Sequence, residues 1–364
     1  MTKVQVNLGE RSYTIHIGMD TLASTGRLIR EITQRTRVAV ISDERVAALY
    51  GKSVMQACRD AGIQGHLFTV PGGEGSKSLS QTENLYTQLI GGGFHRDCLI
   101  AALGGGVVGD LAGFAAATYL RGVSFIQIPT TLLAQVDSSV GGKVGINHAL
   151  GKNLIGSFYQ PQFVLIDPSV LQTLDRREMW AGMAEVVKYG LIWNSGFYEF
   201  LEEKLESLAG LENWDDITHM LALCCRAKAD VVEADEKEGG LRRILNFGHT
   251  LGHALESVTG YGWFRHGEAV VYGMRWAAWV SCREKKISVA LFRRIDALLK
   301  RIPVPSLPDD LDRHRMMERI GVDKKQTSGG LKMVLLDDIG RTAIVSVKDV
   351  SSWVNGWFEE VLNG

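Results

Sequence analysis

Histidine and glutamate side chains recur in one stretch of the second half of the chain, at spacings that suit metal binding. His249 and His253 lie four residues apart, Glu256 follows one helical turn later, and His266 comes shortly after. Two histidines and a carboxylate that leave one position open are the usual composition of a catalytic zinc site. The spacing alone favours His249 and His253 as the ligand pair, because residues four apart share one face of a helix.

A further carboxylate belongs to a segment that otherwise reads as small and apolar. Glu185 and Lys188 are three residues apart within Met183-Ala184-Glu185-Val186-Val187-Lys188. A buried carboxylate without a partner is costly. Glu185 is therefore expected to pair with Lys188 or to bind a cation.

Glycines form the second chemical signal. The run Gly104-Gly105-Gly106-Val107-Val108-Gly109-Asp110 satisfies GxGxxG between a predicted strand and a predicted helix, a context in which backbone N–H groups hold a pyrophosphate. The usual fingerprint places a ribose-binding acid about 20 residues later, but the next strand ends in Pro129-Thr130-Thr131. The candidate ribose acid is Asp43, so the sequence predicts a dinucleotide site of unusual order.

A second glycine-rich region is polar as well. Asp137–Lys143 and Gly151-Lys152-Asn153 place two lysines and an asparagine near the predicted nucleotide loop. Lysines among glycines suit a phosphate or a carboxylate.

Two kinds of domain must position these residues. The first half alternates strand and helix signals, and its strands are continuously hydrophobic, which predicts an α/β nucleotide-binding domain with a parallel sheet covered on both faces. The second half has a helical period and predicts a mainly α-helical metal- and substrate-binding domain. We place the two domains at residues 1–174 and 175–364. The expected strands are Arg37–Asp43, His66–Val70, Cys98–Leu103, Ser124–Ile128 and Phe163–Ile166, with Met333–Leu336 and Thr342–Val347 near the C-terminus; the expected helices of the second half are Arg177–Trp193, Gly196–Leu208, Asp215–Glu233, Thr250–Val258, Gly267–Glu284 and Val289–Lys300.

Composition excludes several classes of protein. The chain has 364 residues, and its 40 Lys+Arg nearly balance 41 Asp+Glu, which argues against nucleic-acid binding through a basic field. The apolar stretches are too short to span a membrane, and the first residues lack the apolar core of a signal peptide. The 5 cysteines show no CxxC spacing, so neither a disulfide framework nor a cysteine-ligated zinc is implied. We expect a cytoplasmic protein.

Together these motifs resemble the 3-dehydroquinate synthases, a family of sugar-phosphate cyclases. The resemblance runs in order from about Asp43 to Lys325 and rests on Gly104–Asp110, Ile128–Lys143, Gly151–Gly156, Ala184–Gly190, Leu245–Thr250 and His266–Val270. It implies that Glu185, His249 and His266 hold Zn²⁺ or Co²⁺. His253 then becomes a nearby proton-relay or hydrogen-bonding residue instead of a ligand.

The resemblance also implies contacts with NAD and with the substrate. The NAD contacts would be Asp43, Glu74, Lys77, Gly105, Gly106, Val107, Val108, Gly109, Asp110, Thr130, Thr131, Lys143, Lys152 and the segment around Thr173. The substrate contacts would be Asp137, Lys143, Asn153, Lys188, Lys228, Arg242, Asn246 and either Lys324 or Lys325. Arg121 would reach the substrate phosphate of a neighbouring subunit, which implies a homodimer.

The implied activity is that of a carbon–oxygen lyase in the second step of the shikimate pathway. A seven-carbon keto-acid sugar phosphate, 3-deoxy-D-arabino-heptulosonate 7-phosphate, would become 3-dehydroquinate and phosphate, with NAD used catalytically. Three alternatives stay open: another sugar-phosphate cyclase, a metal-dependent NAD alcohol dehydrogenase, and a non-catalytic nucleotide-binding protein. The set of lysines and arginine favours an anionic substrate, and a complete set of metal, relay and anion-binding residues disfavours a non-catalytic protein.

Overall fold

The structure, a computed structural model, describes residues 1–34, 37–325, 331–347 and 350–362. These residues form two compact units: Met1–Asp175 with Asn213–Lys237, and Arg176–Glu212 with Glu238–Gly364. The segment Asn213–Lys237 thus groups with the first unit, although it follows residue 174 in the chain. The cysteines are free thiols. Within the described ranges, no helix is both long and apolar enough to cross a membrane.

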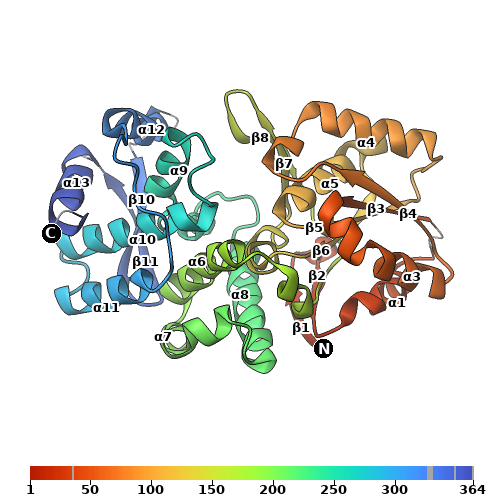
Figure 1. Ribbon diagram of the computed structural model, residues 1–364, viewed down its shortest axis with the longest axis horizontal. Coiled ribbons are helices and arrows are strands. Elements are labelled where there is room, and N and C mark those ends of the chain that lie inside the picture. The colour runs from red at the N-terminus through yellow and green to blue at the C-terminus, as the bar shows by residue number, and fades with distance from the viewer. Residues whose placement is uncertain (35–36, 326–330, 348–349, 363–364) are drawn as a thin grey trace. The chain divides into compact units, whose positions relative to one another are not determined.

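The first unit is built on a seven-stranded sheet (Figure 1), counted over the described residues. Its strands pair in parallel except for the antiparallel pair β1–β2. In order across the sheet they are β1 (Thr2–Val6), β2 (Tyr13–Ile17), β9 (Phe163–Ile166), β6 (Ser124–Pro129), β5 (Leu99–Gly104), β3 (Arg37–Asp43) and β4 (Gln64–Val70). The predicted α/β unit with its mostly parallel sheet is confirmed.

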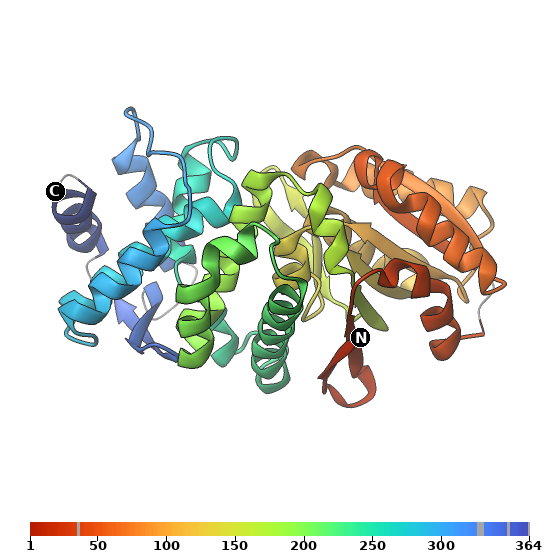
Figure 2. The same cartoon turned by 60° about the horizontal axis from the view of Figure 1, so that its bottom comes forward.

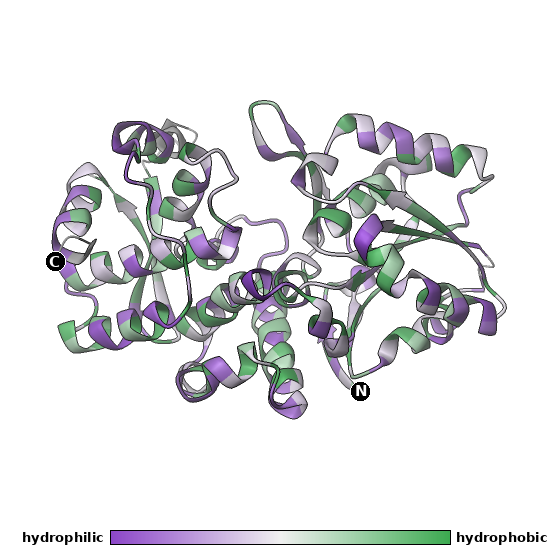
Figure 3. Cartoon of the chain, in the orientation of Figure 1, coloured by the Kyte–Doolittle hydropathy of each residue, from purple (hydrophilic) through white to green (hydrophobic). Residues whose placement is uncertain are grey.

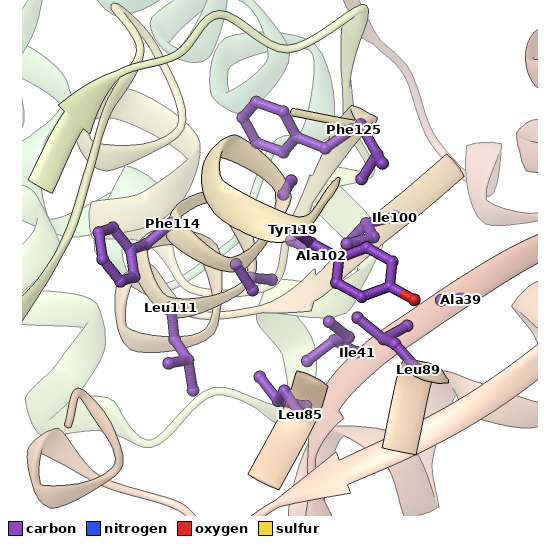
Figure 4. Packing of buried hydrophobic residues seen from close by; sticks show 14 of the residues in the cluster. Ala39, Ile41, Leu85, Leu89, Ile100, Ala102, Leu111, Phe114, Tyr119 and Phe125 are labelled. Atoms are coloured by element: carbon purple, nitrogen blue, oxygen red, sulfur yellow. The ribbon is translucent and has the colours of Figure 1, made fainter. Parts of the chain in front are cut away.

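Both faces of this sheet are buried under helices. Alternate residues of each strand point to opposite faces, so a central strand contributes side chains to both of them. In β3, Ala39 and Ile41 pack with the helices on one face, and Val38 and Val40 pack with those on the other. Figure 4 shows the first of these clusters and Figure 2 the helices on either side of the sheet. One face carries α4 (Leu79–Gly91) and α5 (Gly106–Thr118), and the other carries α1 (Thr25–Ile32) and α3 (Lys52–Asp60), which follows the short α2 (Glu44–Val46). In Figure 3 the strands are mostly hydrophobic, whereas hydrophilic and hydrophobic residues alternate along α4.

Two features of this unit had no clear signal in the sequence. The glycine-rich region after Gly142 forms an antiparallel hairpin, β7 (Lys143–His148) and β8 (Gly151–Phe158), in which Gly145 pairs with Gly156. Facing glycines carry no side chains, so the period of two that marks a strand is absent there. The helix α8 (Trp214–Ala234) packs against β1, away from its neighbours in the chain.

The second unit is mainly helical, as predicted. Its central helices α6 and α10 are buried over most of their length. Its elements are α6 (Arg176–Trp193), α7 (Ser195–Ala209), α9 (His249–Val258), α10 (His266–Arg283), α11 (Val289–Lys300), α12 (Arg313–Lys325), α13 (Val350–Trp357) and the antiparallel hairpin β10 (Leu331–Asp338)–β11 (Arg341–Val347). The predicted helices of this half agree with these bounds to within one or two residues at each end.

Candidate active site

One carboxylate oxygen in the second unit faces two histidine nitrogens. Glu185, on α6, is fully buried, and its Oε1 atom lies 3.6 Å from His249 Nε2 and 3.5 Å from His266 Nε2. Each residue comes from a different helix, with His249 opening α9 and His266 opening α10. Three elements of the helical unit therefore bring one oxygen and two nitrogens to a single point.

The other nitrogen of each ring is already engaged. Nδ1 of His249 donates to the backbone carbonyl of Phe247 at 3.1 Å, and Nδ1 of His266 donates to the carboxylate of Glu256 at 3.1 Å. Because those acceptors can only accept, Nε2 is the nitrogen that each ring keeps for a cation. A neutral histidine whose Nδ1–H is held by a carbonyl or a carboxylate is the usual form of a metal ligand. The donor set of Glu185, His249 and His266 thus fits a zinc or cobalt ion.

Electrostatics at the two histidines point the same way. Burial lowers the pKa of His249 to about 3. The negative charge of Glu185 acts to raise this pKa, whereas the positive charge of Lys188 acts to lower it. Burial also acts to lower the pKa of His266, but its contacts with Glu185 and Glu256 outweigh this and raise the pKa to about 10. His249 is therefore neutral at pH 7. The two carboxylates around His266 favour a positive charge at that place, which a metal ion can supply on displacing the proton.

His253 joins this cluster from the next turn of α9. One nitrogen from each of His249, His253 and His266 lies within 4.8 Å of the others. The ring centroid of His253 is 5.2 Å from that of His249 and 5.8 Å from that of His266. His253 is exposed, whereas Glu185 is buried between the other two histidines. The structure brings together both the spacing-based pair and the set implied by the resemblance.

A close approach of backbones explains why these helices meet at the histidines. Gly273 of α10 lies against Gly248, the residue before His249, and a Cβ atom at position 273 would stand 1.7 Å from the Gly248 carbonyl oxygen. Gly248 itself has a φ of +81°, which favours glycine. The motifs around the histidines therefore carry glycines because the helices touch there.

The other predicted residues of this unit occupy different settings. Lys188 forms an ion pair with Glu185, as burial of the carboxylate predicted, and its Nζ stands 5.0 Å from the ring centroid of Tyr189. Arg242 is buried in a 3-10 turn over Leu241–Asn246, and the exposed Asn246 donates to Glu238 at 3.3 Å. Lys324 and Lys325 end α12, and their side chains lie outside the described part of the structure.

In the first unit, the predicted nucleotide residues gather where strand order reverses. β3 leads to β4 on one side of the sheet, whereas β5 leads to β6 on the other. The carboxyl ends of β3 and β5 are neighbours, and open α/β sheets bind ligands at such a switch point. Asp43 ends β3 and Gly104 ends β5, so the candidate ribose acid and the glycine loop lie at the same edge.

The glycine turn leaves room for a ligand at the start of α5. Gly105 is the N-cap of α5 and has no side chain that could cap the helix. The first backbone N–H groups of α5 are therefore available to an anion. A Cβ atom at Gly105 would stand 3.0 Å from Thr131 Cγ2. Thr130, the residue directly after β6, has a buried hydroxyl with no hydrogen-bond partner among the described residues. A free hydroxyl beside uncapped N–H groups fits a pyrophosphate or a ribose.

A polar network borders this loop. The buried Lys77 ammonium lies 2.6 Å from Asp110 Oδ2 and also donates to Asn153 Oδ1, while Glu74 Oε1 is 3.6 Å away. Burial raises the pKa of Asp110, and Lys77 opposes that rise. Asn147, which the sequence analysis did not select, donates to Glu74 at 2.8 Å and accepts from the backbone of Asn153 at 2.9 Å. Its position on the hairpin β7–β8 explains the omission, because that hairpin was not predicted.

The remaining predicted residues of the first unit fall into one pair and several separate positions. Lys228 on α8 lies 2.6 Å from Asp137 Oδ1, so two predicted substrate contacts meet. Thr173 shares a hydrogen bond of 2.5 Å with Tyr50, in the helical segment that follows Asp43. The positions of the others are: Gly106, Val107, Val108 and Gly109 in the first turns of α5, Lys143 at the start of β7, Lys152 in β8, and Arg121 exposed in the turn after α5.

The folds of these two units are those of the sugar-phosphate cyclases. The solved structure of a 2-deoxy-scyllo-inosose synthase, complexed with carbaglucose-6-phosphate, NAD⁺ and Co²⁺, is 29% identical and superposes with a TM-score of 0.87, covering 99% of this chain and 100% of that chain. A 2-epi-5-epi-valiolone synthase from Streptomyces hygroscopicus shares the fold, with a TM-score of 0.89 at 24% identity over 98% of this chain and 99% of that chain.

Sequence comparison narrows the class to one family. The models of the N-terminal and C-terminal parts of 3-dehydroquinate synthase match residues 67–181 and 182–326. The 3-dehydroquinate synthase of Pelobacter propionicus is 49% identical over 95% of this chain and 96% of its own length, and that of Desulforamulus reducens is 47% identical over 96% and 97%. The chain belongs to the 3-dehydroquinate synthase family and is accordingly a lyase, so the predicted family and enzyme class are confirmed.

Proposed function

We propose that this chain converts 3-deoxy-D-arabino-heptulosonate 7-phosphate to 3-dehydroquinate and phosphate, with NAD at the carboxyl edge of the first unit's sheet and Zn²⁺ or Co²⁺ on Glu185, His249 and His266. When bound, NAD⁺ accepts and returns a hydride, and the divalent ion polarises the alcohol that is oxidised. The observation that carries the proposal is the convergence of Glu185 Oε1 with the two Nε2 atoms at 3.5 and 3.6 Å.

The proposed roles of the remaining residues follow from their charge and burial. Lys188 and Arg242 are almost completely buried cations, and such groups bind anionic substrates through charge-assisted hydrogen bonds. Lys143, Asn153, Lys228, Asn246 and Lys324 complete the proposed set of substrate contacts. His253 is exposed next to the two ligand histidines, a suitable position for moving a proton between the substrate and water.

Asp137 lies in the first unit, where a lysine holds its carboxylate in place. Its carboxylate accepts from Lys228 at 2.6 Å, and the same ammonium donates to the Asp137 backbone carbonyl at 2.7 Å. The lysine thus fixes the carboxylate against its own main chain. We propose that the Asp137 carboxylate accepts a hydrogen bond from the substrate and thereby orients it. The ammonium of Lys228 holds the carboxylate in position for this role.

The proposed NAD contacts share one edge of the sheet. Asp43 would accept from a ribose hydroxyl, since only its Oδ1 atom caps the following helix, at 3.0 Å from the Val46 N–H. The first turn of α5 would hold the pyrophosphate. Glu74, Lys77, Thr130, Thr131, Lys152 and Thr173 would surround the rest of the nucleotide. We further propose that the enzyme acts in the cytoplasm as a homodimer and within the shikimate pathway.

Catalytic use of NAD distinguishes this function from an oxidoreductase. Phosphate and NADH are to be measured together with NAD⁺ below the substrate concentration. The proposal expects many phosphates released per NAD⁺ and no net NADH, because the hydride returns within each turnover. NADH that accumulates in step with product would replace the synthase by an alcohol dehydrogenase.

Substrate choice separates the proposed reaction from that of a sister cyclase. The 2-deoxy-scyllo-inosose synthase that is 29% identical was solved with carbaglucose-6-phosphate, so the corresponding sugar, glucose 6-phosphate, is the informative alternative substrate. Phosphate release from the seven-carbon keto acid, with none from glucose 6-phosphate, supports the proposal. The reverse result would assign the chain to another cyclase.

A further inference from the structure

A second buried carboxylate stands behind one of the proposed metal ligands. Glu256 lies on α9 and is 5% exposed, and its Oε2 atom is 3.1 Å from Nδ1 of His266. The opposite nitrogen of the same ring faces Glu185 at 3.5 Å. The imidazole of His266 is therefore placed between two carboxylates, one at each nitrogen.

The helices make this arrangement specific to one ring. His249 and Glu256 are seven residues apart, which is two helical turns, so α9 offers both on the same side. Gly252, between them, packs against the backbone of α10, where a Cβ atom would stand 3.3 Å from Ala269. This close contact holds the Glu256 side of α9 against the start of α10, where His266 lies. One helix thus supplies a ligand and the partner of the other histidine.

Two other buried carboxylates of this unit, Glu268 and Asp296, have different partners. Glu268 pairs with Arg177 and Asp296 pairs with Arg275 at 2.7 Å, so these two neutralise arginines. Glu256 instead accepts from a ring whose other nitrogen points at the ligand centre. A carboxylate in that position fixes the tautomer and the plane of the ring and strengthens the opposite nitrogen as a ligand.

We propose that Glu256 is a positioning residue, which holds His266 with Nε2 toward Glu185 and thereby sets the affinity of the site for its divalent metal. This inference rests on the proposed ligand set and adds a residue that touches neither metal nor substrate. In this role the carboxylate acts through the His266 ring. Its loss should weaken metal binding while the fold and the other ligands persist.

The test compares Co²⁺ and Zn²⁺ binding in the full-length protein and in the Glu256→Gln variant. Dissociation constants come from competition with a chelating dye, and the visible absorption of bound Co²⁺ reports its ligand geometry. Glutamine keeps the size of the side chain but removes its charge, so we expect affinity to fall about 10–100-fold and the Co²⁺ bands to shift. Asp296→Asn is the matched control, since it neutralises a buried carboxylate of the same unit that contacts none of the three histidines. It should leave both readouts unchanged.

The possible outcomes distinguish failure of the positioning role of Glu256 from failure of the proposed metal-ligand set. Unchanged affinity and spectrum in Glu256→Gln, with weakened binding in His266→Ala, would overturn the positioning role alone. A wild-type protein that binds no Co²⁺, or a His266→Ala variant that binds it normally, would overturn the ligand set as well. If Glu256→Gln does not fold, Glu256→Asp provides the same test, because its shorter side chain retracts the carboxylate from Nδ1.

Discussion

Gly267 of α10 packs directly on the carbonyl group of Ala181 on α6, and a Cβ atom at position 267 would lie 1.9 Å from that oxygen. Gly267 follows His266, and Ala181 precedes Glu185 by one helical turn. The contact between these two backbones therefore sets the distance between a proposed ligand on each helix. A glycine that touches no substrate determines the geometry of the site.

Gly267→Ala should accordingly separate the two helices and impair the metal site. Overpacking typically costs about 1–3 kcal/mol of stability, and the shift should also move His266 away from Glu185. We expect a lower unfolding midpoint together with weaker Co²⁺ binding. Gly262→Ala is the control, because a Cβ atom there meets nothing within 4 Å. Equal metal affinity in the two variants would show that the contact does not position the ligands.

The ligand region shows what could be read from sequence and what could not. The helices of the second half were predictable because their apolar period is regular. Spacing selected His249 and His253, which share a helix, but it could not reveal that His266 and Glu185 approach from other helices. Their approach depends on contacts such as Gly267 with Ala181, which are tertiary. The ligand set came from resemblance and stays a proposal.

The strands of the first unit also differ in how far the sequence predicted them. The buried strand Phe163–Ile166 was predicted with its observed bounds, because continuous apolar residues mark a strand buried on both faces. The segments Asp137–Lys143 and Gly151–Asn153 read only as polar and glycine-rich, whereas the structure forms a hairpin over residues 143–158. The network of Glu74, Lys77, Asp110 and Asn153 joins this hairpin to two other segments, the turn at residues 74–77 and helix α5. A local sequence pattern cannot reveal partners that lie on separate segments.

Lys77→Met should lower the free energy of unfolding, because the Asp110 carboxylate would lose its ion-pair partner. Removing one partner of a buried ion pair typically costs about 3–5 kcal/mol. Burial raises the pKa of Asp110, so the loss should be largest above that pKa and should diminish as the pH falls and the carboxyl takes up a proton. Urea unfolding at pH 5 and pH 8 measures this. The double variant Lys77→Met/Asp110→Asn should regain stability but not NAD affinity, which titration calorimetry reports. No recovery would mean that the two residues act separately.

The N-terminal turn is held to the segment after α8 by an ion pair that should fail in acid. Arg11 Nη2 lies 2.7 Å from Glu236 Oε2, and this hydrogen bond, which outweighs burial, lowers the pKa of Glu236. A carboxyl with a lowered folded pKa stabilises the fold above its ordinary pKa, and the effect is lost as the pH falls through the folded value. Glu236→Gln should therefore be less stable than wild type at pH 7, and the difference should shrink as the pH falls through the lowered pKa of Glu236. Glu83→Gln, on the exposed surface of α4, should show no such trend. A pH-independent difference would assign the effect of Glu236 to packing.

The turn after α5 offers a test of the proposed dimer. Leu120 and Arg121 have φ values of 50° and 65°, two successive left-handed conformations that side chains disfavour, and Gly122 follows with a φ of 114°. The turn is fixed by backbone hydrogen bonds from Gly122 to Tyr119 and from Val123 to Ala116. A rigid, strained turn that holds an arginine out from its own chain suits a contact with another subunit.

Complementation between two inactive variants decides whether Arg121 acts across the dimer. Arg121→Ala and His266→Ala should each lose activity, the first through phosphate binding and the second through the metal. When two-fold dimers assemble at random from equal amounts, half are mixed, and each mixed dimer has one site free of both defects if Arg121 serves the partner subunit. The mixture should then recover about a quarter of the wild-type activity. If Arg121 serves its own subunit, every site in the mixture carries a defect and no activity returns. Co-expression with two affinity tags isolates the mixed dimer, whose phosphate release should approach half that of wild type per dimer, and an inactive mixed dimer would restrict Arg121 to its own chain.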